Sequence, residues 1–542
     1  MHDFQMTTLA LGFSFILLAL YYGKSIGSRP KDYPPGPPTL PFLGNLHQIP
    51  KTRRHIQFQK WAQEYGPIYS LILGTKVLIV LSSNEAVKDL LDRRSAIYSS
   101  RTENYLANKV LSGGLRLLLL EYGDTWKQVR KLAHQIMNVK VSRAYVPYQD
   151  LESVAMLMRF LEEPSGFIDH IRRYTSSVTS QMTYGFRITR REEAFFQRAF
   201  KIFAQISTVA DAPTAAILEA FPVLRLLPDI FWPARKLAKR VHIEEHNLFL
   251  EQYMSTRQRL KDGVSKPCFC SDLVRLQDEE GYSDLFAGYL AGSLLQAGSE
   301  TTSAILVGFM QAMIIFPEVA ISAQLEIDRV CGKRMPDLND LPDLPFVRGC
   351  MKESLRWMPA TLLGVPHAVI CDDEYRGYKI PKGAGVMYNV WAIHNDPIRY
   401  PDPRRFSPDR WMDDTQNSAQ SATNADVTKR DHFVFGAGRR ICQGMHIADR
   451  TMFLAMARLL WAFDLHRAVD EKTGEHIVPD MNDLTCGLFS QPKPFRATIV
   501  PRAGKSTRVR EEWHKMRDLL DDDMQWKTVP PGLVWRDYES TE

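Results

Sequence analysis

The sequence Phe435-Gly436-Ala437-Gly438-Arg439-Arg440-Ile441-Cys442-Gln443-Gly444 is a glycine-rich loop that carries one cysteine and leads into an apolar segment with helical periodicity. Glycine permits positive φ and a close approach of the backbone to a ligand, so backbone N–H groups can point at the sulfur of Cys442. Arg440 adds a fixed cation, which favours the thiolate and is suited to neutralise a carboxylate of a bound cofactor. The loop therefore predicts a site that presents a cysteine thiolate to a metal.

These ten residues match the haem-binding loop of the cytochrome P450 family, Phe-Gly-x-Gly-x-Arg-x-Cys-x-Gly, and the chain resembles that family. The resemblance implies the P450 fold, which is mainly α with a small β component. It also implies haem b (iron protoporphyrin IX) as the cofactor, with Cys442 as the axial ligand of the iron. Phe435, Gly438 and Arg440 would contribute to haem binding. A glycine turn that carries a chance cysteine is the alternative interpretation of the loop taken alone.

The composition indicates one large globular domain. The chain has 542 residues, of which 45% are hydrophobic and 24% charged, with no internal repeat and no long linker in the middle. We expect a haem-thiolate monooxygenase domain over residues 42–502. The formal charge of +6 is mild and lacks the clustered basic stripe of nucleic-acid-binding proteins, so no nucleic-acid partner is expected. The charge suits a membrane surface or an acidic protein partner.

The seven cysteines show neither the pairing of a disulfide framework nor the spacing of a zinc site. Cys268 and Cys270 form a lone Cys-x-Cys that lacks a second pair of ligands, so we interpret them as incidental. The domain is expected to face a reducing compartment.

The N-terminal segment predicts a membrane anchor. Residues 6–22 contain no charge, and Lys24, Arg29 and Lys31 follow, which predicts a single-pass transmembrane helix with residues 1–5 luminal and the bulk of the protein cytosolic. The predicted location is the endoplasmic reticulum membrane. A cleaved signal peptide is the alternative, but the segment lacks a basic start and a small-x-small cleavage site. Residues 23–41 are basic and then proline-rich, which predicts a stiff hinge.

The rest of the chain reads mainly as amphipathic helices. A helix is predicted over residues 55–65, and residues 68–73 and 76–81 are predicted to form a hairpin around Gly74-Thr75. Residues 413–429 are polar and predict a surface loop with no catalytic role. Residues 503–542 form a charged tail outside the family pattern, in which Trp513, Met516 and Leu519-Leu520 have near-helical spacing. The sequence assigns this tail no role.

Residues 285–316 predict a long apolar helix that is interrupted by Ala297-Gly298-Ser299-Glu300-Thr301-Thr302. A glycine followed by hydroxyl side chains predicts a local distortion that leaves room for a small molecule, for which O₂ is the natural candidate. The resemblance implies that Glu300 and Thr301 are the catalytic acid–alcohol pair that delivers protons to dioxygen. A kinked core helix with a solvated glutamate is the alternative.

Two further motifs match the family pattern. Glu353 and Arg356 lie three residues apart on one predicted helix face, and the resemblance implies that Arg405 joins them in a buried structural network. Trp126 and Arg130 match Trp-x-x-x-Arg, and the resemblance implies that both reach a haem propionate. His367 corresponds to a basic position that commonly meets a propionate in the family.

Together, these features predict a monooxygenase that inserts one atom of O₂ into a small apolar organic substrate. Because no flavin- or nicotinamide-binding domain is visible, electrons would come from a separate NADPH-dependent flavoprotein reductase, with Lys127, Lys131 and Arg439 as docking charges. The substrate pocket is expected at residues 98–120, 203–227, 294–301, 362–365 and 486–489. Residues 344–369 look most similar to fungal members, many of which act in secondary metabolism. A haem-thiolate rearrangement or dehydration enzyme and a non-catalytic haem sensor are the alternatives.

Overall fold

The computed structural model describes residues 26–528, so the predicted luminal residues 1–5 and the predicted anchor at residues 6–22 lie outside the described residues. Within residues 26–528, no single helix is both long and apolar enough to cross a membrane. Only α12 (Asp284–Ile315) and α13 (Pro317–Cys331) would pass such a test together, as a pair bent by 104°. Most of α12 is buried in the protein core.

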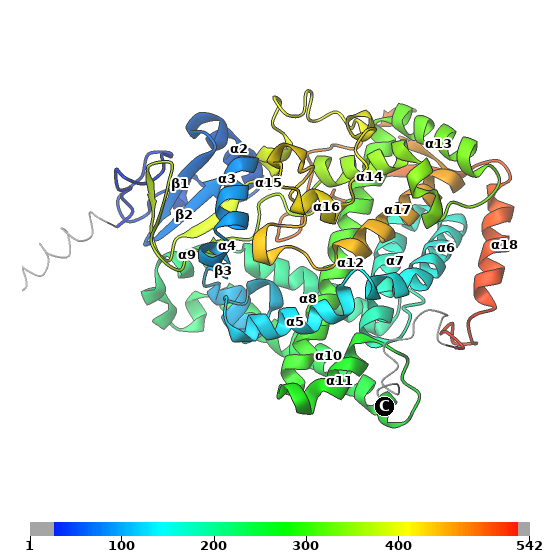
Figure 1. The fold of residues 1–542 in the computed structure, drawn as a ribbon, viewed down its shortest axis with the longest axis horizontal. Coiled ribbons are helices and arrows are strands. Elements are labelled where there is room, and N and C mark those ends of the chain that lie inside the picture. The colour runs from blue at the N-terminus through cyan, green and yellow to red at the C-terminus, as the bar shows by residue number, and fades with distance from the viewer. Residues whose placement is uncertain (1–25, 529–542) are drawn as a thin grey trace, which may run out of the picture.

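The predicted fold class is confirmed: the chain is mainly helical with a small β component (Figure 1). The remaining helices are α2 (Arg54–Tyr65), α3 (Asn84–Val87), α4 (Ser95–Tyr98), α5 (Asp124–Met137), α6 (Val146–Glu162), α7 (Phe167–Tyr184), α8 (Ala194–Asp211), α9 (Pro213–Ala220), α10 (Pro233–Lys261), α11 (Phe269–Glu280), α14 (Pro345–Trp357), α15 (Val390–His394), α16 (Ser418–Thr423), α17 (Met445–Ala462) and α18 (Lys505–Arg517). The strands are β1 (Ile68–Leu73), β2 (Lys76–Leu81), β3 (Ser100–Arg101), β4 (His367–Ala368), β5 (Asp373–Tyr375), β6 (Tyr378–Ile380), β7 (Gly385–Tyr388), β8 (Phe463–Val469), β9 (His476–Ile477) and β10 (Ala497–Pro501).

The main sheet has the strand order β1-β2-β7-β4-β3 and lies at one end of the molecule (Figure 1). The predicted hairpin is confirmed, because β1 and β2 pair antiparallel with Leu73 opposite Lys76. The turn between them has Gly74 at φ 61°, a left-handed conformation that glycine adopts at little cost. The predicted helix over residues 55–65 is also confirmed, as α2.

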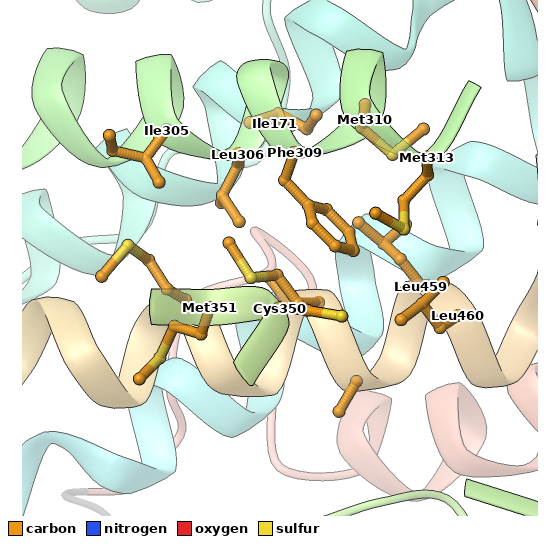
Figure 2. Packing of buried hydrophobic residues seen from close by; sticks show 14 of the residues in the cluster. Ile171, Ile305, Leu306, Phe309, Met310, Met313, Cys350, Met351, Leu459 and Leu460 are labelled. Atoms are coloured by element: carbon orange, nitrogen blue, oxygen red, sulfur yellow. The ribbon is translucent and has the colours of Figure 1, made fainter. Parts of the chain in front are cut away.

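Helix α12 forms the centre of the core. Its first turn is capped by the Ser283 side chain, which accepts from the Phe286 N–H, and it ends before Pro317. Because it is apolar on all sides, it can be surrounded by other elements. In Figure 2, side chains of α12 such as Leu306 and Phe309 reach toward those of α14 and α17.

The part of the proposed hinge that the structure describes is held against the sheet. Arg29 donates to the carbonyl oxygens of Gly36 at 2.8 Å and Ser70 at 3.0 Å, and the Ser70 N–H donates to Pro35 O at 2.7 Å. These bonds tie the proline-rich segment to β1. The carbonyl groups of this proline-rich segment accept hydrogen bonds from Arg29 and from β1. This part of the segment is therefore packed against the domain.

The segment at residues 413–429 differs from the predicted surface loop, because part of it is buried. It contains α16, whose Ser418 and Ser421 are buried. The Ser418 hydroxyl donates to Asp449 of α17 at 2.6 Å, and the Ser421 hydroxyl donates to Asp431. Polar composition indicated exposure, whereas these hydroxyls instead satisfy buried carboxylates.

The C-terminal tail is folded onto the domain as far as the structure describes it. Helix α18 packs along α6 at the end of the molecule opposite the sheet (Figure 1). Beyond it, Trp526 is 5% exposed, and its indole N–H donates to Gln181 Oε1 at 2.6 Å. Gln181 in turn donates to the buried carboxylate of Glu152 at 2.9 Å. The tail thus contributes a buried aromatic side chain to a polar cluster between α6 and α7.

Replacement of Trp526 by alanine tests whether the tail stabilises the domain. We expect a loss of about 3–5 kcal/mol, because a buried indole and its hydrogen bond are removed. The measurement is the midpoint of thermal unfolding. Trp513→Ala on α18 is the matched control, since Trp513 is only half-buried and should cost less. Equal losses for the two variants would contradict a specific role for Trp526.

Candidate functional site

The cysteine loop is held in place by its own backbone. Gly438 has φ 59°, and a Cβ atom there would lie 1.9 Å from Leu91 O. Its N–H donates to Asp92 Oδ1 at 2.6 Å, and the Cys442 N–H donates to Phe435 O at 2.8 Å. Glycine is therefore required at position 438 by the close approach to Leu91. At Gly438, the close neighbour is thus the protein backbone, whereas the glycine pattern predicts the approach of a ligand.

The Cys442 thiol is accessible although protein atoms surround it. The residue is accessible to solvent, yet burial among protein atoms raises the pKa of its thiol. The Gly444 backbone N–H and the Arg130 guanidinium act in the opposite direction and lower that pKa. A backbone donor and a cation next to an accessible sulfur suit a thiolate that ligates a metal.

Three arginines gather beside this cysteine: Arg101 from β3, Arg130 from α5, and Arg440 from the loop. The Arg440 guanidinium lies 4.4 Å from the Trp126 ring centroid, and that of Arg130 lies 5.9 Å from it. Burial, followed by the charges of Arg101 and Arg130, lowers the pKa of Arg440 to about 9. Within residues 26–528, no carboxylate forms an ion pair with any of the three. Uncompensated buried cations are costly, so the cluster fits a ligand with carboxylates of its own, as haem has.

Sequence reasoning missed Arg101, which no motif marks. Arg101 is buried opposite His367 in the pairing of β3 with β4. Its guanidinium donates to Leu118 O at 3.1 Å and to Val365 O at 2.5 Å, so loop carbonyls orient the charge. Only the pairing of these two short strands brings Arg101 to the site.

His367, which the resemblance places against a haem propionate, is buried on β4, and that contact stays a prediction. His367 is buried, and burial together with the charge of Arg101 lowers its pKa well below the usual range, so the imidazole is neutral. Its Nδ1 lies 2.7 Å from Tyr98 O, and because a carbonyl only accepts, Nδ1 carries the hydrogen. Arg101, its cross-strand neighbour, carries a positive charge on this side of the site.

On α12, Thr301 and Gly298 explain the unusual polar segment. The Thr301 hydroxyl donates to Ala297 O at 2.7 Å, the bond back to the preceding turn that the sequence suggested. The predicted long helix is confirmed, since α12 is continuous from Asp284 to Ile315. A Cβ atom at Gly298 would lie 2.6 Å from Thr179 Oγ1, so this glycine allows α7 to approach. Ala297 is exposed although the helix around it is buried.

Glu300 differs from the solvated glutamate of the alternative interpretation. Its carboxyl group accepts a hydrogen bond of 2.9 Å from Gln296, one turn earlier on α12. Burial raises the pKa of Glu300 to about 7, although the Gln296 hydrogen bond and the charges of Arg116 and Arg172 lower it. A carboxyl group with this pKa can both hold and release a proton near neutral pH.

Glu353 and Arg356 form a fully buried bidentate pair on α14, with N–O distances of 2.6 Å and 2.8 Å. The Glu353 carboxylate also accepts from the Ser407 N–H at 3.0 Å and the Trp411 indole N–H at 2.9 Å. Arg356 donates to His394 O at 2.8 Å. These partners outside α14 come from the end of α15 and from the segment between α15 and the cysteine loop.

Arg405 does not belong to this network, contrary to the expectation from the sequence. Its side chain is exposed, and the guanidinium that approaches Glu353 is that of Arg410, at 3.5 Å. Asp402 has φ 48°, and the Arg405 N–H donates to Asp402 O in a tight turn that directs the Arg405 side chain outward. The adjacent Arg404 points inward and stacks on the Trp357 ring, 4.9 Å from its centroid.

The comparisons with known proteins agree with this site. The cytochrome P450 family model matches residues 34–498. The chain belongs to the cytochrome P450 family. This P450 is 59% identical to cytochrome P450 monooxygenase virE of Hypocrea virens, over 98% of this chain and 97% of that protein. It is 57% identical to cytochrome P450 monooxygenase fogE of Aspergillus ruber, over 97% of both chains.

A zebrafish cytochrome P450 solved with abiraterone shares the fold, with a TM-score of 0.65 over 83% of this chain and 99% of that one. At 22% identity, that likeness bears on the fold alone. The family and the high-identity relatives establish this P450 as a haem-thiolate monooxygenase. The roles of individual residues depend on the geometry described above.

Glu353→Gln tests the buried pair of this P450. We expect a cost of about 3–5 kcal/mol, because Arg356 keeps its charge in the core without a counter-charge. The result should be loss of haem incorporation, measured as the ratio of haem to purified protein. Glu162→Gln, opposite Arg159, is the control, since both side chains are more than 40% exposed and the change should cost about 0–1 kcal/mol. Normal haem content in Glu353→Gln would contradict the role of the pair.

Arg101→Met tests the cluster of three arginines. Because a charge-assisted contact to a carboxylate is removed, we expect haem to dissociate about tenfold faster or more. The measurement is the rate of haem transfer to an acceptor apoprotein. Arg439→Met is the control, because Arg439 is exposed and its guanidinium donates to the Tyr122 hydroxyl at 2.5 Å. Equal rates for the two variants would remove Arg101 from the site.

Proposed function

We propose that this P450 uses O₂ and electrons from an NADPH-dependent flavoprotein reductase to hydroxylate or epoxidise a small apolar organic substrate. The observation that carries this proposal is the accessible Cys442 thiol beside three arginines that have no acidic partner within residues 26–528. Haem b, when bound, supplies the O₂ activation and oxygen insertion of the reaction. Cys442 would hold the haem iron, while Arg101, Arg130 and Arg440 would hold its propionates beside Trp126.

Helix α12 would contribute the residues that supply protons to the reaction. With a pKa of about 7, Glu300 holds a proton below neutral pH and loses it as the pH rises. Thr301 lies next to it, and its hydroxyl is held to Ala297 O at 2.7 Å. We therefore assign Glu300 to the supply of protons and Thr301 to the orientation of oxygen or water. Activity that depends on this supply should fall as the pH rises through about 7.

The proposed reductase would dock on the basic residues near the cysteine loop. Lys127 and Lys131 are exposed on α5, and Arg439 is exposed on the loop. Lys127 lies 3.0 Å from Asp124, and Lys131 lies 2.5 Å from Glu280, so both lysines have internal partners. An acidic partner would compete with these two carboxylates for the exposed lysines, which favours a transient complex that depends on salt concentration.

We also assign this P450 to the endoplasmic reticulum membrane, because exposed apolar side chains gather near the start of the described chain. They are Leu40, Phe42, Leu43, Val223, Leu226, Leu227, Ile230 and Phe231. The Gly74 N–H donates to Leu43 O and the Thr75 N–H donates to Ala220 O. The β1–β2 turn therefore links the apolar residues at 40–43 to those at 223–231. The Phe42 N–H donates to Ile26 O at 2.8 Å, so the chain arrives from the uncharged residues 6–22 at this same patch. A patch of this kind suits contact with a lipid surface.

A role in fungal secondary metabolism is the proposed context. It is supported by the similarity to fungal monooxygenases such as virE and fogE. The apolar character expected for the pocket agrees with a hydrophobic substrate.

The reduced, carbon-monoxide-bound absorption spectrum tests the proposed ligand. We expect the band of a thiolate-ligated haem in the native protein, and its loss in Cys442→Ala, because no thiolate then reaches the iron. Cys371→Ala is the control, as Cys371 is also exposed but lies outside the loop. A thiolate band that survives in Cys442→Ala would contradict the assignment. Oxygen uptake that requires both NADPH and the reductase separates the monooxygenase from a haem sensor.

A further inference from the structure

A buried polar chain extends from Glu300 away from the cysteine loop. Arg116, in the loop before the short 3-10 helix Leu117–Leu119, donates to Gln296 Oε1 at 2.7 Å. The same guanidinium donates to Glu245 Oε1 of α10 at 2.5 Å. Arg116 is 5% exposed and Glu245 is 0% exposed, so this is a buried ion pair between the loop and α10.

We propose that Arg116 and Gln296 act as positioning residues for Glu300, fixing the direction and the proton affinity of its carboxyl group, with Glu245 as the counter-charge. The proposal rests on the proposed role of Glu300 as the proton source. It extends that role to residues that the family motifs do not include.

The orientation of the Gln296 amide follows from the hydrogen-bonding groups. A guanidinium only donates, so Gln296 must present its Oε1 to Arg116 and therefore its NH₂ group to Glu300. Glu300 Oε2 is then occupied as an acceptor, which leaves Oε1 for the exchange of a proton. Without Arg116, the amide is free to flip, and its oxygen would accept from a protonated Glu300. The arginine thereby selects which carboxyl oxygen faces the reaction.

Arg116 is itself held at three points. Its Nε donates to the Ser112 hydroxyl at 3.0 Å, in addition to the contacts with Gln296 and Glu245. The same loop is tied to α10 a second time, because His242 Nδ1 donates to Leu111 O at 2.6 Å. The guanidinium is therefore fixed between a loop, α10 and α12. A polar chain with this much support is preorganised rather than formed during turnover.

The charges around Glu300 determine the direction in which each substitution should change its pKa. The charged and titratable groups around Glu300 are Arg116 from the loop, Arg172 from α7, Glu245 and His242 from α10, and Tyr289 from α12. Arg116 favours the ionised carboxylate of Glu300, and Glu245 offsets part of that effect. Removing the arginine should raise the pKa of Glu300, and removing the charge of Glu245 should lower it. A purely structural role for the ion pair predicts no such opposite shifts.

The test is an infrared titration of the ferric holoenzyme, which requires no substrate. The carbonyl stretch of protonated Glu300 is identified as the band that is missing in Glu300→Gln, and its intensity is followed against pH. We expect a midpoint near 7 in the native protein. It should rise by about 0.5–1 pH unit in Arg116→Met and fall by a similar amount in Glu245→Gln. Asp229→Asn, which breaks a 2.5 Å pair with the buried Arg235 of α10, is the matched control and should leave the midpoint unchanged.

The outcomes separate this inference from the proposed function. Variants that bind haem and keep the thiolate band, but share the native midpoint, would overturn the inference and leave the proposed function intact. An absent thiolate band in the native protein would overturn the proposed function, while the titration would still report on Glu300. If Arg116→Met does not fold, Glu245→Gln and the double variant carry the test. The double variant replaces the ion pair by two neutral groups and should also raise the midpoint, because Arg116 is the nearer charge.

Discussion

The buried pair of Glu353 and Arg356 is the interaction on which the position of the cysteine loop depends. Two charges without access to water are tolerable only when every remaining donor and acceptor has a partner. Here the partners come from outside α14, and one of them is the carbonyl of His394. The imidazole of His394 then accepts from the Phe433 N–H at 2.9 Å, two residues before Phe435. A chain of three hydrogen-bonded groups thus connects the ion pair to the loop that carries Cys442.

The buried arginines of the site differ in whether a carboxylate pairs with them. Beside Glu300, the charge of Arg116 is partly compensated by its ion pair with Glu245. Beside the cysteine loop, burial lowers the pKa values of Arg101, Arg130 and Arg440, and within residues 26–528 no carboxylate forms an ion pair with them. A cluster of this kind is stable only if a ligand supplies negative charge. Haem is thus expected to contribute to the folding stability of the protein as well as to its chemistry.

The sequence predicted best where a motif couples residue type to local geometry. The β1–β2 hairpin, α2 and the long α12 followed from periodicity and turn residues, and the Glu353–Arg356 pair followed from helical spacing. The prediction for Arg405 was wrong, because its side chain is exposed beside a turn with Asp402 at positive φ, and the guanidinium near Glu353 is that of Arg410. Arg101 and the state of His367 depend on the pairing of two-residue strands far apart in the sequence, and no local pattern encodes that.

The polar segment of α12 packs tightly against α7 on one face and keeps polar side chains accessible on the other. Gly298 is required because Thr179 of α7 lies against it, and the Thr175 hydroxyl donates to Ser299 O at 2.8 Å. These contacts hold one face of the helix tightly against α7, a helix to which the C-terminal tail is also bound through Gln181 and Trp526. On the other face, Ala297, Glu300 and Thr301 remain accessible. Rigid packing on one face therefore lets an accessible acid and hydroxyl persist on the other, where a mobile helix would solvate Glu300 and return its pKa toward the usual range.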